Sequence, residues 1–298
     1  MVVNVAAVLR PVTIETPADM RSWSRAARGS GRSIALVPTM GALHDGHLTL
    51  IEHARSRADV VVVSIFVNPL QFGEHGDFTS YPRPIDTDLA ACERAQVAAV
   101  YAPTAAAMYP HGFETRVVPG RLAATMEGHS RPGHFEGVTT VVAKLLAAVG
   151  PDLAVFGEKD YQQLAIIRRM VSDLDLGVDV VATPTVREPD GLALSSRNQR
   201  LTPSQRRAAV CIPRSIAEAR DVAARPDATL DAVLARARRV IDDEPQASLD
   251  YVNVFDAATL EAIDDLDDTE RLAGRCRIAI AARFGDVRLI DNADLYDG

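Results

Sequence analysis

The chain has few aromatic residues and few cysteines, and this scarcity excludes several classes of protein. Only 5% of its 298 residues are aromatic, so the core must be built mainly from Ala, Val, Leu and Ile. Its three cysteines, Cys92, Cys211 and Cys276, are far apart and odd in number. They form neither a disulfide framework nor the paired spacing of a zinc site. We expect ordinary buried thiols in a reducing cytoplasm.

Long apolar runs and an excess of positive charge are also missing. No run approaches the roughly 20 apolar residues that span a bilayer. The N-terminus lacks a basic stretch followed by a long apolar core, so it does not resemble a secretory signal. The formal net charge of −8 argues against a general nucleic-acid binder, although it leaves room for a local phosphate pocket. The sequence therefore predicts a cytoplasmic protein with no nucleic-acid partner and no membrane partner.

Three common catalytic signatures are missing as well. There is no GxxxxGK[ST] segment, which excludes a Walker-type phosphate loop. Gly29-Ser30-Gly31 precedes an expected strand instead of following one, so it does not fit the dinucleotide fingerprint. No GxSxG segment supports a serine hydrolase. Any ATP site must use another arrangement.

Short apolar runs alternate with amphipathic segments over about the first 180 residues, as in βαβ units. The runs are rich in valine and isoleucine, which is typical of strands covered on both faces. They are Ser33–Val37, Val60–Val67, Val97–Tyr101, Leu153–Phe156 and Val178–Ala182. The helical patterns are Leu48–Arg57, Asp86–Ala95, Gly137–Ala148 and Tyr161–Asp175. Together they predict an α/β protein with a parallel sheet.

The pattern changes after Pro184. Two helical segments are followed by three strand-like runs, namely Pro203–Ala224, Thr229–Asp243, Leu249–Val254, Arg277–Arg283 and Val287–Ile290. The acidic stretch Asp264–Glu270 fits a solvated connecting loop better than a cation site. We therefore expect a Rossmann-like parallel-sheet domain over residues 1–184 and a smaller C-terminal α+β domain over residues 185–298.

The first candidate site directly follows the first expected strand, in the segment PTMGALHDGH at residues 38–47. Its two glycines let the backbone turn sharply and approach a ligand closely. The helix that follows directs its N-terminal amides towards the turn, which favours phosphate binding. His44 and His47 are three residues apart, so both imidazoles can donate to one phosphate. Alone, this segment predicts only attack on the α-phosphate by some nucleophile.

Two further segments carry groups that suit phosphate. GEKD at residues 157–160 lies between an expected strand and a helix, where an open parallel sheet binds ligands. There Lys159 supplies a point charge. LSSR at residues 194–197 offers two hydroxyls and the fixed fork of a guanidinium. Alone, the second segment is more often a turn than a site, but together with the histidine pair it predicts a site.

These motifs resemble those of a known family. HxGH between a buried strand and a helix is the signature of the nucleotidyltransferase superfamily. Residues 38–47 and four later segments resemble the pantothenate synthetase (pantoate–β-alanine ligase) family in its own order. The four are SIFVNPLQFG at Ser64–Gly73, RPGHFEGVTTVVAKL at Arg131–Leu145, FGEKDYQQL at Phe156–Leu164 and TVREPDGLALSSRN at Thr185–Asn198. The resemblance implies a cytosolic homodimer, a first domain that binds ATP and pantoate, and a lid-like second domain.

The resemblance also implies the site residues. The catalytic groups would be His44, His47, Lys159 and Arg197. The ATP contacts would be Met40, Gly41, Ala42, Leu43, His44, Asp45, Gly46, His47, Gly157, Glu158, Lys159, Asp160, Val186, Leu194, Ser195, Ser196 and Arg197. The contacts to pantoate and β-alanine would be Gln71, Gln163, Asn68, Met40 and His134.

A metal ligand is less clear. ATP chemistry uses Mg²⁺, which binds one or two carboxylates together with phosphate oxygens and water. The resemblance places the ion near Asp86-Thr87-Asp88, where Thr87 interrupts what is often an acidic run. We expect Mg²⁺ to be held mainly by the ATP phosphates, with Asp88 as its candidate protein ligand.

The reaction that the resemblance implies joins (R)-pantoate to β-alanine at the expense of ATP, through a pantoyl-adenylate, and releases AMP and pyrophosphate. A carboxylate with a pKa of about 4 is already ionised, so its attack needs fixed cations and donors instead of a base. One alternative is an HxGH enzyme that transfers a nucleotide to a phosphorylated alcohol, which has no need of PLQFG or the paired glutamines. Another is a catalytically silent nucleotide-binding module, against which the intact candidate catalytic groups argue.

Overall fold

A computed structural model describes residues 10–72, 78–266 and 273–296. Gly73 of the expected pantoate segment and residues 267–270 of the acidic stretch lie outside these described residues. The chain divides into two compact units. The first reaches to Gly157 and includes Ile166–Thr183, while the second consists of Glu158–Ala165 and the chain from Pro184 onward. The segment that begins at Glu158 thus belongs to the second unit, although its neighbours in sequence belong to the first.

The first unit contains a parallel sheet, which confirms the α/β class expected from the sequence. Its six strands pair in the order β1-β4-β3-β2-β5-β6. They are β1 (Val12–Ile14), β2 (Ile34–Thr39), β3 (Val60–Ile65), β4 (Ala99–Tyr101), β5 (Leu153–Gly157) and β6 (Asp179–Thr183). The short β1 was not expected, because three residues with only one buried side chain carry no apolar run.

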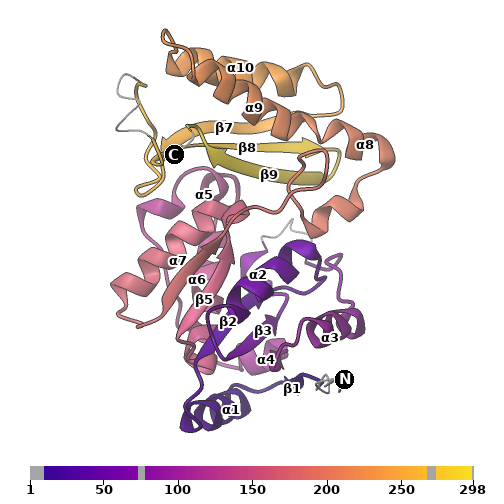
Figure 1. Cartoon of the computed structure of the whole chain (residues 1–298), viewed down its shortest axis with the longest axis vertical. Helices are drawn as coiled ribbons and strands as arrows, with labels where there is room; N and C mark the ends of the chain where they lie inside the picture. The colour runs from indigo at the N-terminus through magenta and orange to yellow at the C-terminus, as the bar shows by residue number, and fades with distance from the viewer. Residues whose placement is uncertain (1–9, 73–77, 267–272, 297–298) are drawn as a thin grey trace, which may run out of the picture. The chain divides into compact units, whose positions relative to one another are not determined.

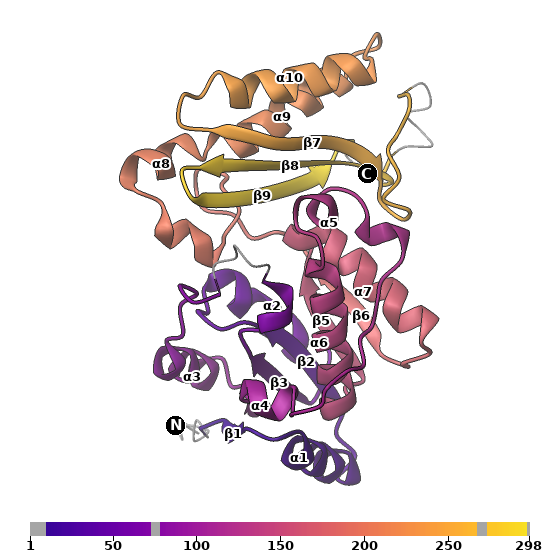
Figure 2. The same ribbon diagram turned by 180° about the vertical axis from the view of Figure 1, so that it is seen from behind.

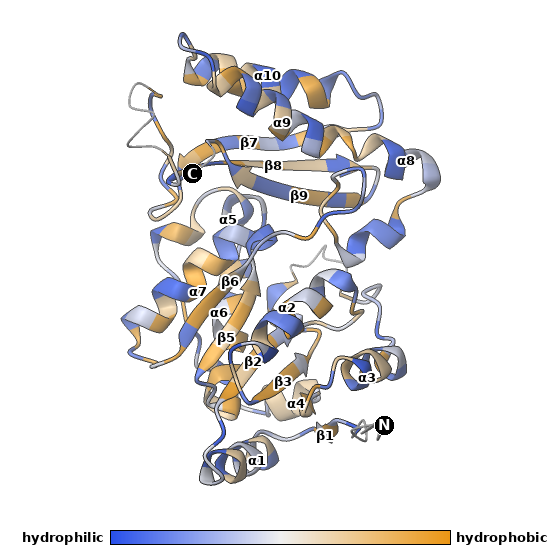
Figure 3. Cartoon of the chain, in the orientation of Figure 1, coloured by the Kyte–Doolittle hydropathy of each residue, from blue (hydrophilic) through white to orange (hydrophobic). Residues whose placement is uncertain are grey.

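Helices cover both faces of this sheet. Those before Pro184 are α1 (Pro17–Gly29), α2 (Asp45–Arg55), α3 (Ile85–Arg94), α4 (Ala105–Met108), α5 (Glu127–Ser130), α6 (His134–Val149) and α7 (Tyr161–Asp173). Helices α2 and α3 share a core with one face, and α1 and α6 pack together on the other, as the opposite views of Figures 1 and 2 show for α2 and α6. The central strands are accordingly hydrophobic along their length (Figure 3).

The strand order of the first unit reverses at β2. The chain moves from β2 to β3 on one side and later returns to β5 on the other side of β2. Open α/β sheets bind ligands beyond the carboxyl ends of the strands at such a point. Strand β2 ends at Thr39, immediately before residues 40–47, which are called the HxGH turn from here on, and β5 ends at Gly157. The topology therefore places the HxGH turn where the fold favours a ligand.

The second unit is an α+β structure, as expected. Its antiparallel sheet has the order β7-β8-β9, formed by β7 (Ser248–Asp256), β8 (Cys276–Phe284) and β9 (Val287–Asp294). Its helices are α8 (Pro203–Ala208), α9 (Cys211–Ala223) and α10 (Leu230–Asp242). Helices α9 and α10 pack against each other and cover one face of the sheet (Figure 1).

The continuous helix expected over Pro203–Ala224 is wrong, because α8 ends at Ala208 and α9 begins at Cys211. Pro213 explains the break. Proline has no N–H to donate to the carbonyl four residues earlier, so it is tolerated only in the first turn of a new helix. No helix in the described part of the chain is both long and apolar enough to cross a membrane.

Candidate active site

The HxGH turn has a backbone that requires glycine at its first bend. Gly41 has φ +83° and Ala42 has φ +52°, so two successive residues are left-handed. A Cβ on Gly41 would lie 2.9 Å from Asp88 Oδ2 and 3.0 Å from Ile65 Cγ2. The turn is therefore packed closely against the carboxyl end of β3 and against α3.

Asp88 holds this turn from α3. Its side chain is buried, with 1% exposure, and its two carboxylate oxygens each accept one backbone amide. Oδ2 accepts the N–H of Ala42 at 2.8 Å and Oδ1 accepts the N–H of Leu43 at 2.8 Å. Burial raises the pKa of Asp88 above its usual value, while the two amide hydrogen bonds act in the opposite direction. In this structure the carboxylate fixes the conformation of the turn.

The residues around Asp88 do not form a ligand set for a protein-held Mg²⁺. Within residues 10–72, 78–266 and 273–296, no group of three His, Cys, Asp or Glu side chains could hold a metal ion. Asp86, two residues away, is exposed on α3, and the Asp88 carboxylate faces the turn amides. The metal role of Asp88 stays a prediction.

The two histidines of the turn lie together at the start of α2. His44 is the N-cap residue, and its ring centroid lies 4.1 Å from that of His47. The backbone N–H of His44 donates to Nδ1 of His47 at 3.3 Å. Because an N–H can only donate, Nδ1 accepts, and neutral His47 carries its proton on Nε2. The pair thus offers an imidazole donor beside the N-terminal amides of α2, which suits a phosphate.

Gln71, Asn68 and Met40 form a second group in the first unit. Gln71 lies in the short 3-10 helix η1 (Pro69–Gln71), and its side chain is buried. Its Nε2 lies 3.1 Å from Sδ of Met40, which itself follows β2. The side chain of Asn68 donates to Oε1 of Gln71 at 3.0 Å. The structure therefore brings together three of the residues predicted to contact pantoate.

Two backbone groups fix the orientation of the Asn68 amide. Its Nδ2 donates to the carbonyl of Gly137 at 3.0 Å, and its Oδ1 accepts the N–H of Leu70 at 3.3 Å. Because a carbonyl only accepts and an N–H only donates, the amide cannot be reversed. The hydroxyl of Tyr109 donates to the same Oδ1 at 2.7 Å. Burial of Tyr109 raises the pKa of its hydroxyl, so the proton needed for this bond is retained.

His134, predicted to contact pantoate, lies against the main chain of Gln71. Its Nδ1 donates to the Gln71 carbonyl at 2.8 Å, and Arg131 donates to the same carbonyl at 3.3 Å. Gly137, in the first turns of α6, permits this approach. A Cβ there would lie 2.4 Å from the carbonyl carbon of Leu70 and 2.6 Å from the amide nitrogen of Gln71. The start of α6 therefore supports the main chain of Gln71.

The second unit carries the other predicted residues. Lys159 lies in η3 (Glu158–Asp160), and its Nζ is 3.7 Å from Asp160 Oδ1. Residues 186–194 form a short hairpin, in which Arg187 and Ala193 pair as an antiparallel bridge and the N–H of Leu194 donates to the carbonyl of Val186 at 2.9 Å. Ser195 then caps η4 (Ser196–Arg200), accepting the N–H of Arg197 at 3.3 Å. These side chains are all partly exposed.

The paired glutamines belong to different units. Gln71 is part of the first unit, and Gln163 lies in the segment of α7 that belongs to the second. The first unit therefore positions the histidine pair and Gln71. The second unit positions Lys159 and the turn at residues 195–197. The role of Gln163 in binding pantoate stays a prediction.

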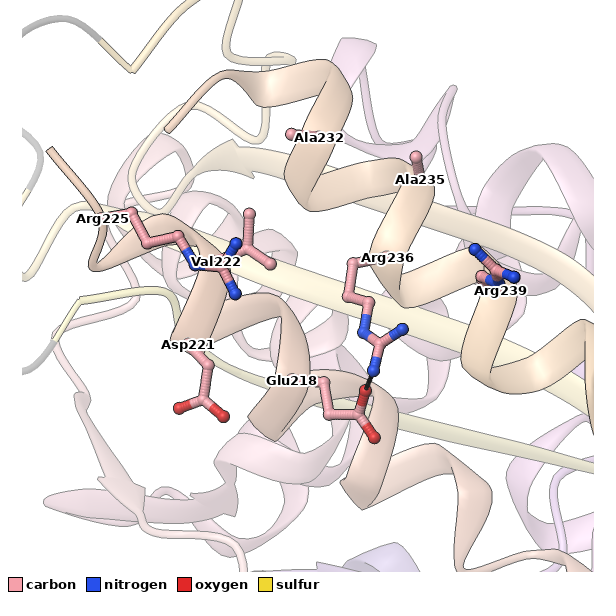
Figure 4. Close-up of a pocket in the computed structure, with 8 residues that line it drawn as sticks. All are labelled: Glu218, Asp221, Val222, Arg225, Ala232, Ala235, Arg236 and Arg239. Atoms are coloured by element: carbon pink, nitrogen blue, oxygen red, sulfur yellow. Dashed lines mark ion pairs between the residues drawn. The ribbon is translucent and has the colours of Figure 1, made fainter. Parts of the chain in front are cut away.

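A groove in the second unit lies away from the predicted residues. It runs between α9 and α10 (Figure 4). Its lining consists of Glu218, Asp221, Val222, Arg225, Ala232, Ala235, Arg236 and Arg239. Glu218 and Arg236 form an ion pair across it. None of these residues belongs to the HxGH, GEKD or SSR segments, so the groove is not the candidate active site.

Sequence analysis missed Tyr109 and the contact made by Gly137. Tyr109 follows a short alanine-rich helix, and neither periodicity nor motif spacing distinguishes it there. Its partner Asn68 lies 41 residues away in sequence. Gly137 was recognised as the start of a helix, but its packing against η1 depends on a contact that the pattern does not encode. Both residues act through the placement of Gln71.

The sequence is similar to proteins of one known family. Residues 12–294 match the family described as pantoate-beta-alanine ligase. Pantothenate synthetase of Geobacter sulfurreducens is 48% identical over 282 residues, covering 95% of this chain and 98% of that protein. Pantothenate synthetase of Acidothermus cellulolyticus is 51% identical over 283 residues, covering 95% of this chain and 91% of that protein.

Solved structures agree with the sequence comparison. Pantothenate synthetase from Thermus thermophilus superposes with a TM-score of 0.88 at 44% identity, covering 96% of this chain and 99% of that one. Pantoate-beta-alanine ligase from Francisella tularensis, solved with beta-gamma ATP and beta-alanine, gives a TM-score of 0.79 at 34% identity, covering 97% of this chain and 99% of that one. The chain belongs to the pantoate–β-alanine ligase family of carbon–nitrogen ligases.

Proposed function

We propose that the chain joins (R)-pantoate and β-alanine to form pantothenate, using ATP and passing through a pantoyl-adenylate. The family match and the names of its relatives support the overall reaction. The ligase solved with beta-gamma ATP and beta-alanine supports the use of both ligands. The observation on which the adenylate step rests is the histidine pair at the start of α2, with ring centroids 4.1 Å apart.

The first step is attack of the pantoate carboxylate on the α-phosphorus of ATP, with pyrophosphate as the leaving group. This carboxylate is ionised at neutral pH, since its pKa is about 4. The obstacle is electrostatic, because an anion approaches a polyanion. Fixed hydrogen-bond donors lower this barrier without reorganising during the reaction. We assign this role to His44, to Nε2 of His47 and to the N-terminal amides of α2.

The second unit supplies the remaining charge in this proposal. Lys159 and Arg197 are cationic, and Ser195 and Ser196 add hydroxyl donors. These groups suit the triphosphate chain and the pyrophosphate that leaves. Mg²⁺ would accompany ATP, bound through phosphate oxygens. In the second step the neutral amine of β-alanine attacks the acyl carbon of the adenylate, which forms the amide and releases AMP.

Gln71 is assigned to pantoate because its amide presents a donor. A neutral donor binds a carboxylate or hydroxyl oxygen without adding a charge. Met40 lies against the same amide nitrogen and offers an apolar surface to the methyl groups of the substrate. Asn68 and His134 hold Gln71 in place.

Isotope exchange separates the steps of this proposal. Labelled pyrophosphate should enter ATP only when pantoate is present, and β-alanine should then release AMP and pantothenate. Absence of exchange with pantoate would contradict the adenylate. Exchange without amide formation would support adenylation and exclude ligation.

Two further features complete the proposal. A homodimer is inferred from the resemblance to the family, and light scattering of the purified protein tests it. A cytoplasmic location is inferred from the three cysteines, all of them buried and unpaired. Burial raises the pKa of Cys92, Cys211 and Cys276 to about 12 in each case. Fractionation of the producing cells tests the location.

A further inference from the structure

Strand β9 carries a buried asparagine that makes two hydrogen bonds to the segment of Lys159. Asn292 is 4% exposed, and its Nδ2 donates to the carbonyl of Glu158 at 2.9 Å and to that of Lys159 at 2.9 Å. These carbonyls are successive in η3, so both protons of a single side-chain amide hold the main chain of the GEKD segment. All three residues belong to the second unit.

The orientation of the Asn292 amide is fixed from both sides. Its Oδ1 accepts a hydrogen bond from Nη2 of Arg277 at 2.9 Å. A guanidinium has only donors, and the two carbonyls of η3 have only acceptors. The amide therefore cannot reverse, and it connects a buried cation on β8 to the backbone of η3.

Arg277 contacts the same segment directly. It is 7% exposed, and its guanidinium carbon lies 4.1 Å from the ring centroid of Tyr161, the first residue of α7. Its Nη2 lies 3.9 Å from Glu158 Oε2, and its Nη1 is 2.8 Å from Asp294 Oδ1. Because the ion pairs and the ring fix the guanidinium, the asparagine has a rigid partner. Residues 158–161 are thus attached to strands β8 and β9 through both side chain and main chain.

We propose that Asn292 is a positioning residue for Lys159, which fixes the main chain from which this lysine reaches the ATP phosphates. The inference rests on the proposed role of Lys159. A lysine side chain is a flexible four-carbon stem, so the location of its ammonium depends on where its backbone is held. Misplacement of a charged group by about 1 Å is enough to lower a rate by two orders of magnitude. The C-terminal sheet thereby contributes to ATP binding without contacting ATP.

The test compares Asn292→Asp with Asn253→Asp. The first replaces the donating nitrogen by an oxygen that faces two carbonyl oxygens, while the other oxygen still accepts from Arg277. The second makes the same change on β7, which is separated from β9 by β8. In pyrophosphate exchange, Asn292→Asp should raise the KM for ATP or lower kcat by at least about 10-fold, with the KM for pantoate within about threefold. Asn253→Asp should leave both KM values within about twofold of the unaltered protein.

A double-mutant cycle with Lys159→Ala separates positioning from general loss of structure. If Asn292 acts through Lys159, Asn292→Asp should change exchange kinetics by less than about threefold in the Lys159→Ala background. An equal loss in both backgrounds would overturn the inference. Thermal melting checks that each variant is folded, and Asn292→Ser replaces Asn292→Asp in every assay if the latter does not fold.

The outcomes keep the two proposals distinct. If the unaltered protein shows no pantoate-dependent exchange, the proposed function fails. If it exchanges normally and Asn292→Asp has the same KM for ATP and the same kcat, only the positioning role of Asn292 fails.

Discussion

Nδ2 of Asn68 donates to Oε1 of Gln71 at 3.0 Å, so Gln71 is held with its nitrogen at the opposite end of the amide. That nitrogen lies 3.1 Å from Sδ of Met40, which is a weak acceptor. Gln71 is thereby fixed as a donor and cannot turn its oxygen towards a ligand. A substrate that accepts hydrogen bonds, through a carboxylate or a hydroxyl oxygen, is the one that this arrangement suits.

We expect Asn68→Asp to reverse this polarity. A carboxylate oxygen would replace Nδ2 beside the Gln71 amide. Gln71 would lower its energy by rotating its nitrogen towards the new carboxylate, and it would then present Oε1 to the substrate. The KM for pantoate in pyrophosphate exchange should rise by about 10- to 100-fold, the range of one or two lost hydrogen bonds. The KM for ATP should change by less than about threefold.

Tyr109→Phe is the matched control for this variant. It removes one donor to Asn68 Oδ1 but leaves the backbone bonds from Leu70 and to Gly137 that orient the amide. The KM for pantoate should rise by about two- to tenfold, which is less than for Asn68→Asp. A larger effect of Tyr109→Phe than of Asn68→Asp would contradict the argument from amide orientation.

Replacement of Asp88 by Asn distinguishes a turn-holding role from a metal-binding role. The new NH₂ group would face the N–H of Ala42 or Leu43, so one backbone donor would lose its acceptor. We expect a loss of about 2 kcal/mol in the free energy of unfolding, measured with urea, and a loss of exchange activity. Raising the Mg²⁺ concentration should not restore activity. Recovery at high Mg²⁺ would indicate that Asp88 binds the metal.

The parallel sheet and the HxGH turn could be predicted from sequence because both depend on local patterns. Residues 34–37 and 60–63 are all apolar and all buried, as is typical of strands covered on both faces. The turn is encoded by glycines and histidines within ten residues. In the second unit, the break between α8 and α9 could have been read from Pro213.

The supports of the site could not be predicted, because they join residues that are distant in sequence. Asn292 reaches a segment 134 residues earlier, and nothing in the composition of β9 distinguishes it from an exposed strand residue. Asp88 was identified as an acidic residue near the site, but its contacts with two turn amides depend on how α3 packs against β2 and β3. Sequence motifs therefore identify the residues that contact a ligand more readily than the residues that position those contacts.

Gly137→Ala should disturb the site from α6. The added methyl would overlap the backbone of Leu70 and Gln71, which cannot move aside as a side chain can. We expect a loss of about 1–3 kcal/mol in the free energy of unfolding, together with a higher KM for pantoate, because η1 must shift. Gly29→Ala is the control, since a Cβ there meets nothing within 4 Å. Equal stability of the two variants would exclude this close contact.

The three cysteines should resist alkylation in the folded protein. Burial raises their pKa to about 12, so at pH 8 only about one thiol in ten thousand is a thiolate, against about a quarter in an unfolded chain. Mass spectrometry after iodoacetamide treatment should show no modification before urea is added and three modifications afterwards.

The same three thiols should make the free energy of unfolding depend on pH. Because the folded form retains thiol protons that the unfolded form loses, the free energy of unfolding should fall as pH rises from about 9 to 12.

His47→Ala tests the electrostatic role assigned to the histidine pair. His47 Nδ1 is engaged by the backbone N–H of His44, so Nε2 is the donor that the substitution removes. Loss of one preorganised donor to a developing phosphoryl charge should slow pyrophosphate exchange by about 10²- to 10³-fold. The melting temperature should fall only slightly, since the side chain is partly exposed.

His53→Ala is the control on the same helix. It removes a histidine whose Nδ1 contacts Thr183 at 2.7 Å, and the variant should retain most of the activity. Near-normal exchange by His47→Ala would exclude the role proposed for this side chain, whereas equal losses in both variants would point to the stability of α2 instead.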